Sequence, residues 1–265
     1  MKIVMYGAGG PVAEAAIAAL EIRHTLRLCD IRPPSEPHPS LQGDATGNAS
    51  RWWPSRPARR DHEFRQVDVT NPDQVRDAAE GMDAIVNLTV VRPDPVMAFR
   101  VNLVGAYHVM NAAVAHGIRR VVHTGPEVII DHYWHDFDIT AEAPPRPGTN
   151  LYLITKYLGQ DVVRSFAEVH GLDVVALYFH VFQPGDAPER MKGASPFLVS
   201  WADTGRAFQA AVEAPPMPNA YEPFIITGDL PHGRFGSEKA KRLLGWHPQD
   251  RFEGHWRRPA VRQGV

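Results

Sequence analysis

Residues 1–20, MKIVMYGAGGPVAEAAIAAL, decide the fold. The apolar run KIVMY (2–6) predicts a buried strand, and PVAEAAIAAL (11–20) predicts a helix of small residues after a glycine turn. Gly7, Gly10 and Ala13 give the pattern G-x-x-G-x-x-A. This pattern provides a tight turn, close approach of the backbone to a pyrophosphate, and a small residue where the helix packs on the sheet. A glycine turn between a strand and a helix therefore predicts a dinucleotide site.

The same alternation of strand and helix continues along the chain. Asn71 and Pro72 have the residue types of a helix cap and first turn, and Gly117 and Gly171 follow two long helical patterns. Strands rich in Val, Ile and Leu between helices predict an α/β fold, a Rossmann-type doubly wound parallel sheet. The further strands are expected at 25–30, 62–69, 83–89, 119–125 and 172–179, and the helices at 71–82, 95–116 and 150–170.

The alternation breaks after residue 180. A helix from Ser200 to Glu213, the strand-like FIITG (224–228) and the helix SEKAKRLL (237–244) follow. This tail is short for an independent domain. We expect residues 1–180 to form a dinucleotide-binding Rossmann domain and residues 181–265 a small C-terminal substrate cap packed on it.

Composition and charge exclude several classes. The 265 residues carry a net charge of −2, which gives no electrostatic argument for nucleic acid or an anionic membrane. Cys29 is the single cysteine, so an internal disulfide is excluded. No apolar run approaches the roughly 20 residues that span a bilayer, and the N-terminus has no signal-peptide pattern. We expect a cytoplasmic protein.

The cofactor is predicted from Asp30, which ends the second strand. A carboxylate there accepts hydrogen bonds from the adenosine ribose and repels a 2′-phosphate, so NAD is favoured over NADP. Arg32 leaves NADP possible, because a nearby guanidinium binds such a phosphate. Asp68 could reach the adenine amino group, and Asn87 lies beside the expected cofactor path; either could instead be a loop-end cap. The other expected cofactor contacts are Pro11, Val12, Ile31, Val69, Leu88 and Thr89.

Tyr152 and Lys156, in NLYLITKYLGQD, are one helical turn apart and share a face. An ammonium beside a phenol favours the phenolate, which lowers the tyrosine pKa towards the working pH. The same lysine can bind the nicotinamide ribose. We expect Tyr152 and Lys156 to be both catalytic and cofactor-binding residues.

With these motifs the chain resembles the extended short-chain dehydrogenase/reductase family, the NAD-dependent sugar epimerases, dehydratases and dehydrogenases. The resemblance rests on YGAGGPVA, LCDI, VDVT, VNLT, RVNLVGAYHVMNAAVAHGIRRVVHTG, the YLITK helix and KAKRLLGWHPQD. It is strongest to the uronate dehydrogenases. The resemblance implies that Tyr152 transfers the proton, assisted by Lys156, and that Arg190 holds a sugar acid's carboxylate. It also implies that Asn102 lies on the helix ordering the site and is a cofactor contact.

The chain departs from the family in VVHTGPEVII (121–130). The family's catalytic serine falls on Pro126, which has neither a hydroxyl nor an N–H. Glu127 and Val128 stand where uronate dehydrogenases carry polar substrate-binding residues. Three interpretations stay open: Thr124 supplies the hydroxyl, Glu127 does new acid–base work, or the site binds a dinucleotide without turnover. Pro126, Glu127 and Arg190 are the candidate substrate-binding residues.

Two further segments carry motifs to which we assign no functional site. DHYWHD (131–136) offers two histidines, but a metal site needs three or four ligands, so no metal is predicted. RWWPSRPARR (51–60) lies in a Pro/Trp-rich insertion (33–61) that we expect to pack on the protein body. The long helices at 95–116 and 150–170 could form the four-helix bundle of a homodimer, as in many family members, or their apolar stripes could belong only to the core.

These features predict an NAD-dependent oxidoreductase acting on a sugar or sugar acid. Its partner is then a small-molecule substrate, and no nucleic acid or membrane is expected. The alternatives are an epimerase or dehydratase that retains its NAD, and a non-catalytic dinucleotide-binding regulator.

Overall fold

The structure of this protein is a computed structural model. It describes residues 1–33, 36, 61–126, 139–183, 198–229 and 235–252.

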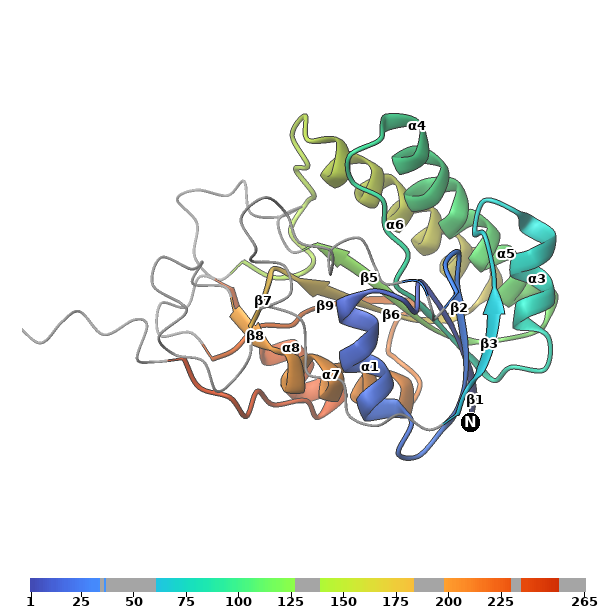
Figure 1. The fold of residues 1–265 in the computed structure, drawn as a ribbon. Helices are drawn as coiled ribbons and strands as arrows, with labels where there is room; N and C mark the ends of the chain where they lie inside the picture. Colours follow the sequence, from blue (N-terminus) through green and yellow to red (C-terminus); the bar gives the residue numbers. More distant parts are fainter. Residues whose placement is uncertain (34–35, 37–60, 127–138, 184–197, 230–234, 253–265) are drawn as a thin grey trace, which may run out of the picture.

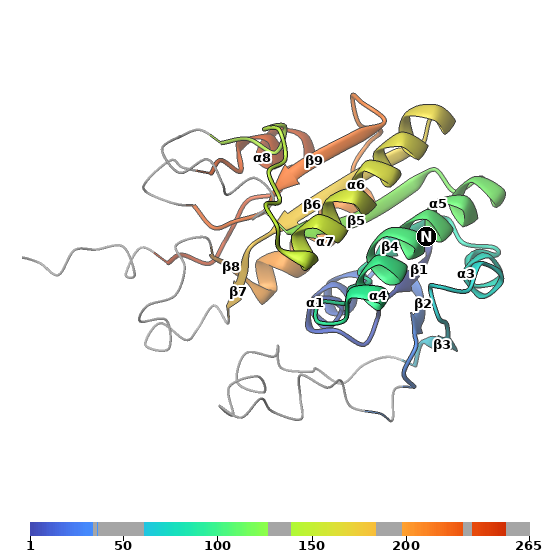
Figure 2. The same ribbon diagram turned by 90° about the horizontal axis from the view of Figure 1, so that it is seen from above.

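A parallel sheet of seven strands forms the centre of the molecule (Figure 1). Its strands are β1 (Lys2–Tyr6), β2 (Thr25–Asp30), β3 (Glu63–Gln66), β4 (Ala84–Asn87), β5 (Arg120–Pro126), β6 (Asp173–Phe179) and β9 (Tyr221–Ile225). Their spatial order is β3-β2-β1-β4-β5-β6-β9 (Figure 2). The predicted doubly wound α/β fold is confirmed.

The strand order positions the site. The chain first moves outward from β1 to β3 and then crosses back to β4 on the other side of β1. The loops that leave β1 and β4 therefore diverge and open a crevice at the carboxyl ends of the two strands, where ligands of such folds bind.

Helices cover both faces of the sheet (Figure 1). One face carries α3 (Pro72–Ala79), α4 (Pro95–Ala98), the π-helix η2 (Phe99–Gly105), α5 (Ala106–Ala115) and α6 (Leu151–His170). The other carries α1 (Pro11–Leu20), α7 (Trp201–Glu213) and α8 (Glu238–Leu244). Within the described residues, no helix combines the length and apolar character needed to cross a membrane.

Local sequence signals explain where helices begin and end. The Asn71 side chain accepts hydrogen bonds from the backbone N–H groups of Asp73 and Gln74, at 3.1 and 3.2 Å, and Pro72 occupies the first turn of α3. Gly171 ends α6 in the left-handed conformation, at φ +61°. Both predicted boundaries are confirmed.

The helix expected at 95–116 differs from the prediction, since a π-helical segment, η2, interrupts it. Asn102 lies in that segment, and its side chain bonds both the Val91 backbone and Thr155 of α6. The wider turn also brings the Asn102 carbonyl against α6, where a Cβ on Gly159 would lie 2.2 Å from that oxygen. The helix is therefore distorted where it has to contact the β4 loop and α6 together, and such distortions are frequent at functional sites.

The C-terminal part contributes to both layers. The fully buried strand β9 pairs with β6 as the seventh strand, and α7 shares an apolar core with α1. The short strands β7 (Val181–Gln183) and β8 (Leu198–Ser200) pair with each other outside the main sheet. The division into residues 1–180 and a cap at 181–265 stays a prediction.

Candidate active site

The glycine turn lies between β1 and α1 and touches the loop after β4. Gly7 has φ +81°, and a Cβ on it would lie 2.9 Å from the Leu88 carbonyl carbon and the Thr89 nitrogen. A side chain at this position would be strained and would also push against backbone. The turn leads directly into α1, whose first N–H groups lack partners within the helix. It is thus shaped to receive an anion such as a pyrophosphate.

Asp30 holds this turn. One carboxylate oxygen accepts a hydrogen bond from the Gly9 N–H at 2.9 Å, and the other accepts one from the Arg32 N–H at 3.1 Å. The Arg32 guanidinium lies 3.7 Å from the same carboxylate. The side chain expected to attract a 2′-phosphate is therefore paired with the residue expected to repel it.

A cavity of about 130 Å³ adjoins Asp30. It gathers residues from the ends of β1, β2, β3 and β4, as expected of an adenosine site. Its lining includes Gly7, Asp30, Ile31, Arg32, Asp68, Val69 and Thr89. The glycine cradle, the carboxylate and the apolar walls fit the adenosine half of NAD. Asp68 also serves its own turn, because its carboxylate accepts a hydrogen bond from the Thr70 N–H at 2.9 Å.

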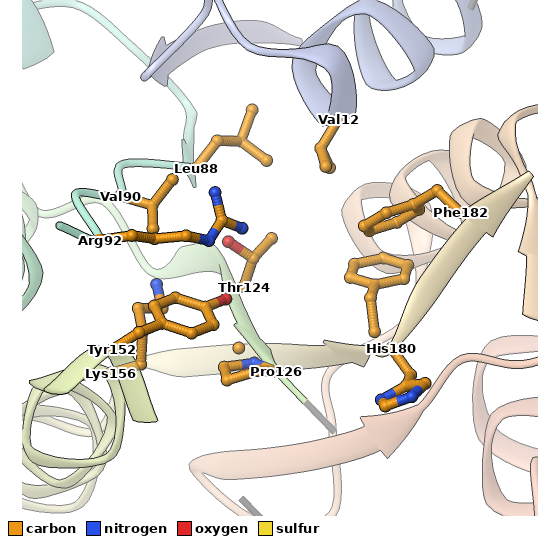
Figure 3. Close-up of a pocket in the computed structure, with 12 residues that line it drawn as sticks. Val12, Leu88, Val90, Arg92, Thr124, Pro126, Tyr152, Lys156, His180 and Phe182 are labelled. Atoms are coloured by element: carbon orange, nitrogen blue, oxygen red, sulfur yellow. The ribbon is translucent and has the colours of Figure 1, made fainter. Parts of the chain in front are cut away.

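A second cavity of about 280 Å³ opens over the ends of β4, β5 and β6 (Figure 3). It brings together Tyr152 and Lys156 of α6 with Thr124 and Pro126 of β5. Val12, Leu88, Val90, Arg92, Gly125, Phe179, His180 and Phe182 complete its lining. In Figure 3 the Tyr152 hydroxyl points into the cavity towards Thr124, which places the expected proton-transfer group facing the open space.

The electrostatics of this cavity differ from the sequence expectation. Burial raises the pKa of Tyr152, and the Arg92 guanidinium, which hydrogen-bonds to it, opposes that rise. Burial, together with Arg92, lowers the pKa of Lys156 to about 7. Lys156 is therefore only partly charged at neutral pH, and Arg92 is the charge that favours the Tyr152 phenolate.

Arg92 reaches the site from the loop after β4. Its Cζ lies 4.7 Å from the centroid of the Tyr152 ring, which is a cation–π contact. The sequence interpretation missed this residue. A signal was available, because Arg92 follows β4 by five residues and the carboxyl ends of parallel strands carry the ligand contacts of such folds.

Asn102 lies beneath the site and holds it together. Its amide N–H groups donate to the Val91 carbonyl at 2.7 Å and to Thr155 Oγ1 at 2.9 Å, and its amide oxygen accepts from the Val91 N–H at 2.9 Å. The side chain thereby ties the loop that carries Arg92 to the helix that carries Tyr152. Asn102 orders the site rather than lining its cavities.

Asn87 also lies behind the cavities, buried at 1% exposure. Its amide oxygen accepts from the Thr89 hydroxyl at 2.8 Å, and its amide nitrogen contacts His123 Nδ1 at 3.2 Å. The Lys156 ammonium lies 3.5 Å from the Thr89 carbonyl. Burial, with Lys156 as a second cause, holds the pKa of His123 well below its usual value. Asn87 thus caps the chain end of β4 through Thr89, and its contact with the cofactor stays a prediction.

Pro126 is the last residue of β5 and pairs with Phe179 of β6. The Thr124 hydroxyl donates to the Asn87 carbonyl at 3.1 Å, so its hydrogen is engaged. Gly125 leaves the space that Gln160 of α6 fills, since a Cβ there would lie 1.7 Å from the amide nitrogen. Glu127, Val128, Arg190 and residues 131–136 lie outside the described residues.

The chain is similar to known proteins in sequence and in fold. Residues 4–212 match the model of the NAD dependent epimerase/dehydratase family. An NAD-dependent glucose-6-phosphate dehydrogenase from Haloferax volcanii is 24% identical, over 95% of this chain and 96% of that protein. A uronate dehydrogenase from Pseudomonas syringae pv. tomato is 30% identical, over 60% of this chain and 58% of that protein. The crystal structure of a glucuronic acid dehydrogenase from Chromohalobacter salexigens shares the fold, with a TM-score of 0.73 and 22% identity over 100% of this chain and 90% of that one.

Proposed function

Because the chain belongs to the NAD dependent epimerase/dehydratase family, we propose that it is an NAD-dependent dehydrogenase of a sugar or sugar acid. The observation that carries the proposal is the position of Tyr152. Its hydroxyl faces a cavity that also receives Lys156, beside the glycine turn and Asp30. The names of the relatives, sugar-phosphate and uronate dehydrogenases, support a sugar substrate.

In this proposal three groups of residues would hold NAD. The turn at Gly7, Gly10, Pro11 and Val12 takes the pyrophosphate, and Asp30 with Ile31, Asp68 and Val69 takes the adenosine. Leu88, Thr89, Tyr152 and Lys156 surround the nicotinamide ribose. When bound, NAD supplies the acceptor for the hydride that leaves the substrate carbon.

The chain's own residues manage the proton. Tyr152 as phenolate accepts the proton of the substrate hydroxyl, so that a carbonyl forms at the carbon that loses hydride. Lys156 takes part in holding the cofactor ribose. Asn102 keeps the β4 loop and α6 in fixed positions relative to each other during the reaction. A substrate carboxylate is assigned to Arg190 by the family resemblance alone.

The absence of a side-chain hydroxyl at Pro126 is the feature that raises the alternatives to this function. The missing serine hydroxyl would cost on the order of 10² to 10³ in rate, which weakens an enzyme without abolishing its activity. Thr124 is a poor replacement as a donor, because its hydroxyl hydrogen already bonds to Asn87. An epimerase or dehydratase that retains NAD, and a regulator that binds NAD without turnover, are the second and third candidates.

The test is NADH formation by the purified protein with NAD and a panel of uronic acids, sugar phosphates and neutral aldoses. A dehydrogenase forms NADH in step with an oxidised sugar product. Cofactor that copurifies with the protein, together with a rearranged or dehydrated sugar and no net NADH, supports the epimerase or dehydratase. NAD binding without conversion of any sugar supports the regulator and contradicts the proposed function.

A further inference from the structure

Arg92 is a charged side chain at the site, and the expected Tyr152–Lys156 mechanism assigns it no role. It is exposed and hydrogen-bonds to Tyr152, and among the described residues no carboxylate forms a salt bridge with it. Its guanidinium contacts the Tyr152 ring, at 4.7 Å from Cζ to the centroid, and lines the same cavity as the Tyr152 hydroxyl. In Figure 3 it extends across the cavity between Leu88, Thr124 and Tyr152. An arginine that only supported the fold would be expected to end on a carbonyl or a carboxylate.

Among the described residues of β5 and α6 that line the cavity, the expected donors to the reacting oxygen are missing or already engaged. Pro126 has neither a hydroxyl nor an N–H, and the Thr124 hydroxyl donates to the Asn87 carbonyl. The Lys156 ammonium is directed at the Thr89 carbonyl and is only 3% exposed. Within the described lining, Arg92 thus provides a permanent positive charge with several N–H donors facing the cavity.

We propose that Arg92 is a catalytic residue that donates a hydrogen bond to the reacting oxygen of the substrate beside Tyr152, in place of the hydroxyl that Pro126 lacks. The proposal rests on the proposed dehydrogenase function. As the hydroxyl proton passes to the Tyr152 phenolate and the C–O bond becomes a carbonyl, negative charge gathers on that oxygen. The guanidinium stabilises this charge and transfers no atom itself.

The position of Arg92 favours this role over anchoring a distant acid group. The guanidinium lies against the tyrosine that exchanges the proton, at the reacting end of any sugar. An anchor for the carboxylate of a uronic acid would instead contact a group that the oxidation leaves unchanged. The two roles differ in what they change, because an anchor acts on KM for acidic sugars and a polarising donor acts on kcat for all substrates.

The charged and titratable groups that face Tyr152 come from three elements. Arg92 approaches from the β4 loop, Lys156 from α6, and His180 from the chain after β6. His123 lies behind Lys156 on β5. Of these, Arg92 is the one whose charge lowers the pKa of Tyr152. Its removal should move the tyrosine titration to higher pH, while the loss of a purely structural contact would not.

The experiment compares Arg92→Gln, Arg92→Lys and the control Arg100→Gln, which removes an exposed arginine outside the cavity. Tyr152 is titrated by tyrosinate absorbance in the full-length protein without substrate, as the difference between each protein and its Tyr152→Phe counterpart. We expect Arg92→Gln to raise the pH midpoint of the Tyr152 titration above the wild-type value. Arg92→Lys should bring the midpoint most of the way back to the wild-type value, and Arg100→Gln should leave it unchanged. An unchanged midpoint in Arg92→Gln overturns the proposal whether or not a substrate is known.

Kinetics then test the role in turnover. Arg92→Gln should lower kcat about 10²-fold on acidic and neutral sugars alike, and added guanidinium ion should restore part of the loss. A KM increase confined to acidic sugars, without rescue, overturns the proposal in favour of an anchor. A shift of the Tyr152 midpoint in Arg92→Gln, together with a wild-type protein that turns over no sugar, contradicts the dehydrogenase function and supports the Arg92–Tyr152 coupling alone.

Discussion

Asp30 accepts a hydrogen bond from the Gly9 N–H at 2.9 Å, so the end of β2 and the glycine turn after β1 form one unit. The carboxylate has two functions at once: it fixes the turn, and it places a negative charge where the adenosine ribose of NAD is expected. Asp30→Asn separates the two, because an amide oxygen still accepts from Gly9.

We expect Asp30→Asn to shift the ratio of NAD to NADP affinity by about 10²-fold towards NADP. The reason is that the mutation removes a charge repulsion worth a few kcal/mol near a 2′-phosphate and frees Arg32 to bind that phosphate. Calorimetric titration of both dinucleotides measures the ratio. An unaltered preference would mean that Asp30 does not face the ribose.

Gly7→Ala should abolish measurable NAD binding and lower the free energy of unfolding by about 2–5 kcal/mol, the sum of left-handed strain and overpacking. The added Cβ would meet the backbone of Leu88 and Thr89 at 2.9 Å. Gly81→Ala is the matched control, since Gly81 has φ +72° but open space around it. It should cost about 1–2 kcal/mol and leave NAD binding intact. Equal costs in the two variants, measured by urea unfolding, would rule out the close approach at Gly7.

Lys156→Met should stabilise the protein while it removes activity. The folded lysine titrates near pH 7, against 10.5 for the ordinary group. Between these pH values the unfolded state binds more protons, so the wild-type free energy of unfolding rises with pH across that window and the buried charge costs most at and below pH 7. The expected gain for Lys156→Met is on the order of several kcal/mol at pH 7 and vanishes above pH 10.5.

Denaturant unfolding at several pH values measures this difference, and Lys2→Met, at an exposed lysine, provides the control. If Lys156→Met is no more stable than the wild type at pH 7, the lysine does not carry a buried charge in the free protein.

We expect the protein to form a homodimer through α4, η2 and α5 with α6. Val96, Phe99, Val104 and Tyr107 project from this side at 62, 40, 40 and 48% exposure. Tyr107 also contacts Phe166 of α6, at 5.4 Å between ring centroids. Tyr107→Glu should therefore convert dimers to monomers in sedimentation velocity. Ile22→Glu, at an exposed residue beyond the end of α1, should not; a wild-type monomer at micromolar concentration would contradict the expectation.

The sequence predicted the fold well because its signals were local and mutually consistent. The glycine turn, the Asn71 cap and Gly171 each require a particular backbone conformation, and the structure has it. The π-helical turn at Asn102 was not predicted, because it depends on contacts with Val91 and Thr155, which are distant in the sequence.

The site was only partly predictable for the same reason. Tyr152 and Lys156 were expected to act together, and Thr124 was one of three interpretations of the missing serine; the structure places all three in the lining of one cavity. The coupling of Tyr152 to Arg92 was missed, since an arginine in a loop gives no periodic signal and its contact is decided by tertiary packing. The pKa of Lys156 depends on burial, which a sequence pattern does not report.

In the proposed dehydrogenase function, Tyr152 exchanges the substrate proton as NAD oxidises the sugar. The most direct measurement compares the rate of NADH formation by the wild type and by Tyr152→Phe on the best sugar of the panel, with NAD affinity measured in parallel. We expect Tyr152→Phe to lower kcat about 10² to 10⁴-fold with NAD affinity nearly unchanged. Turnover by Tyr152→Phe at the wild-type rate would contradict this expectation.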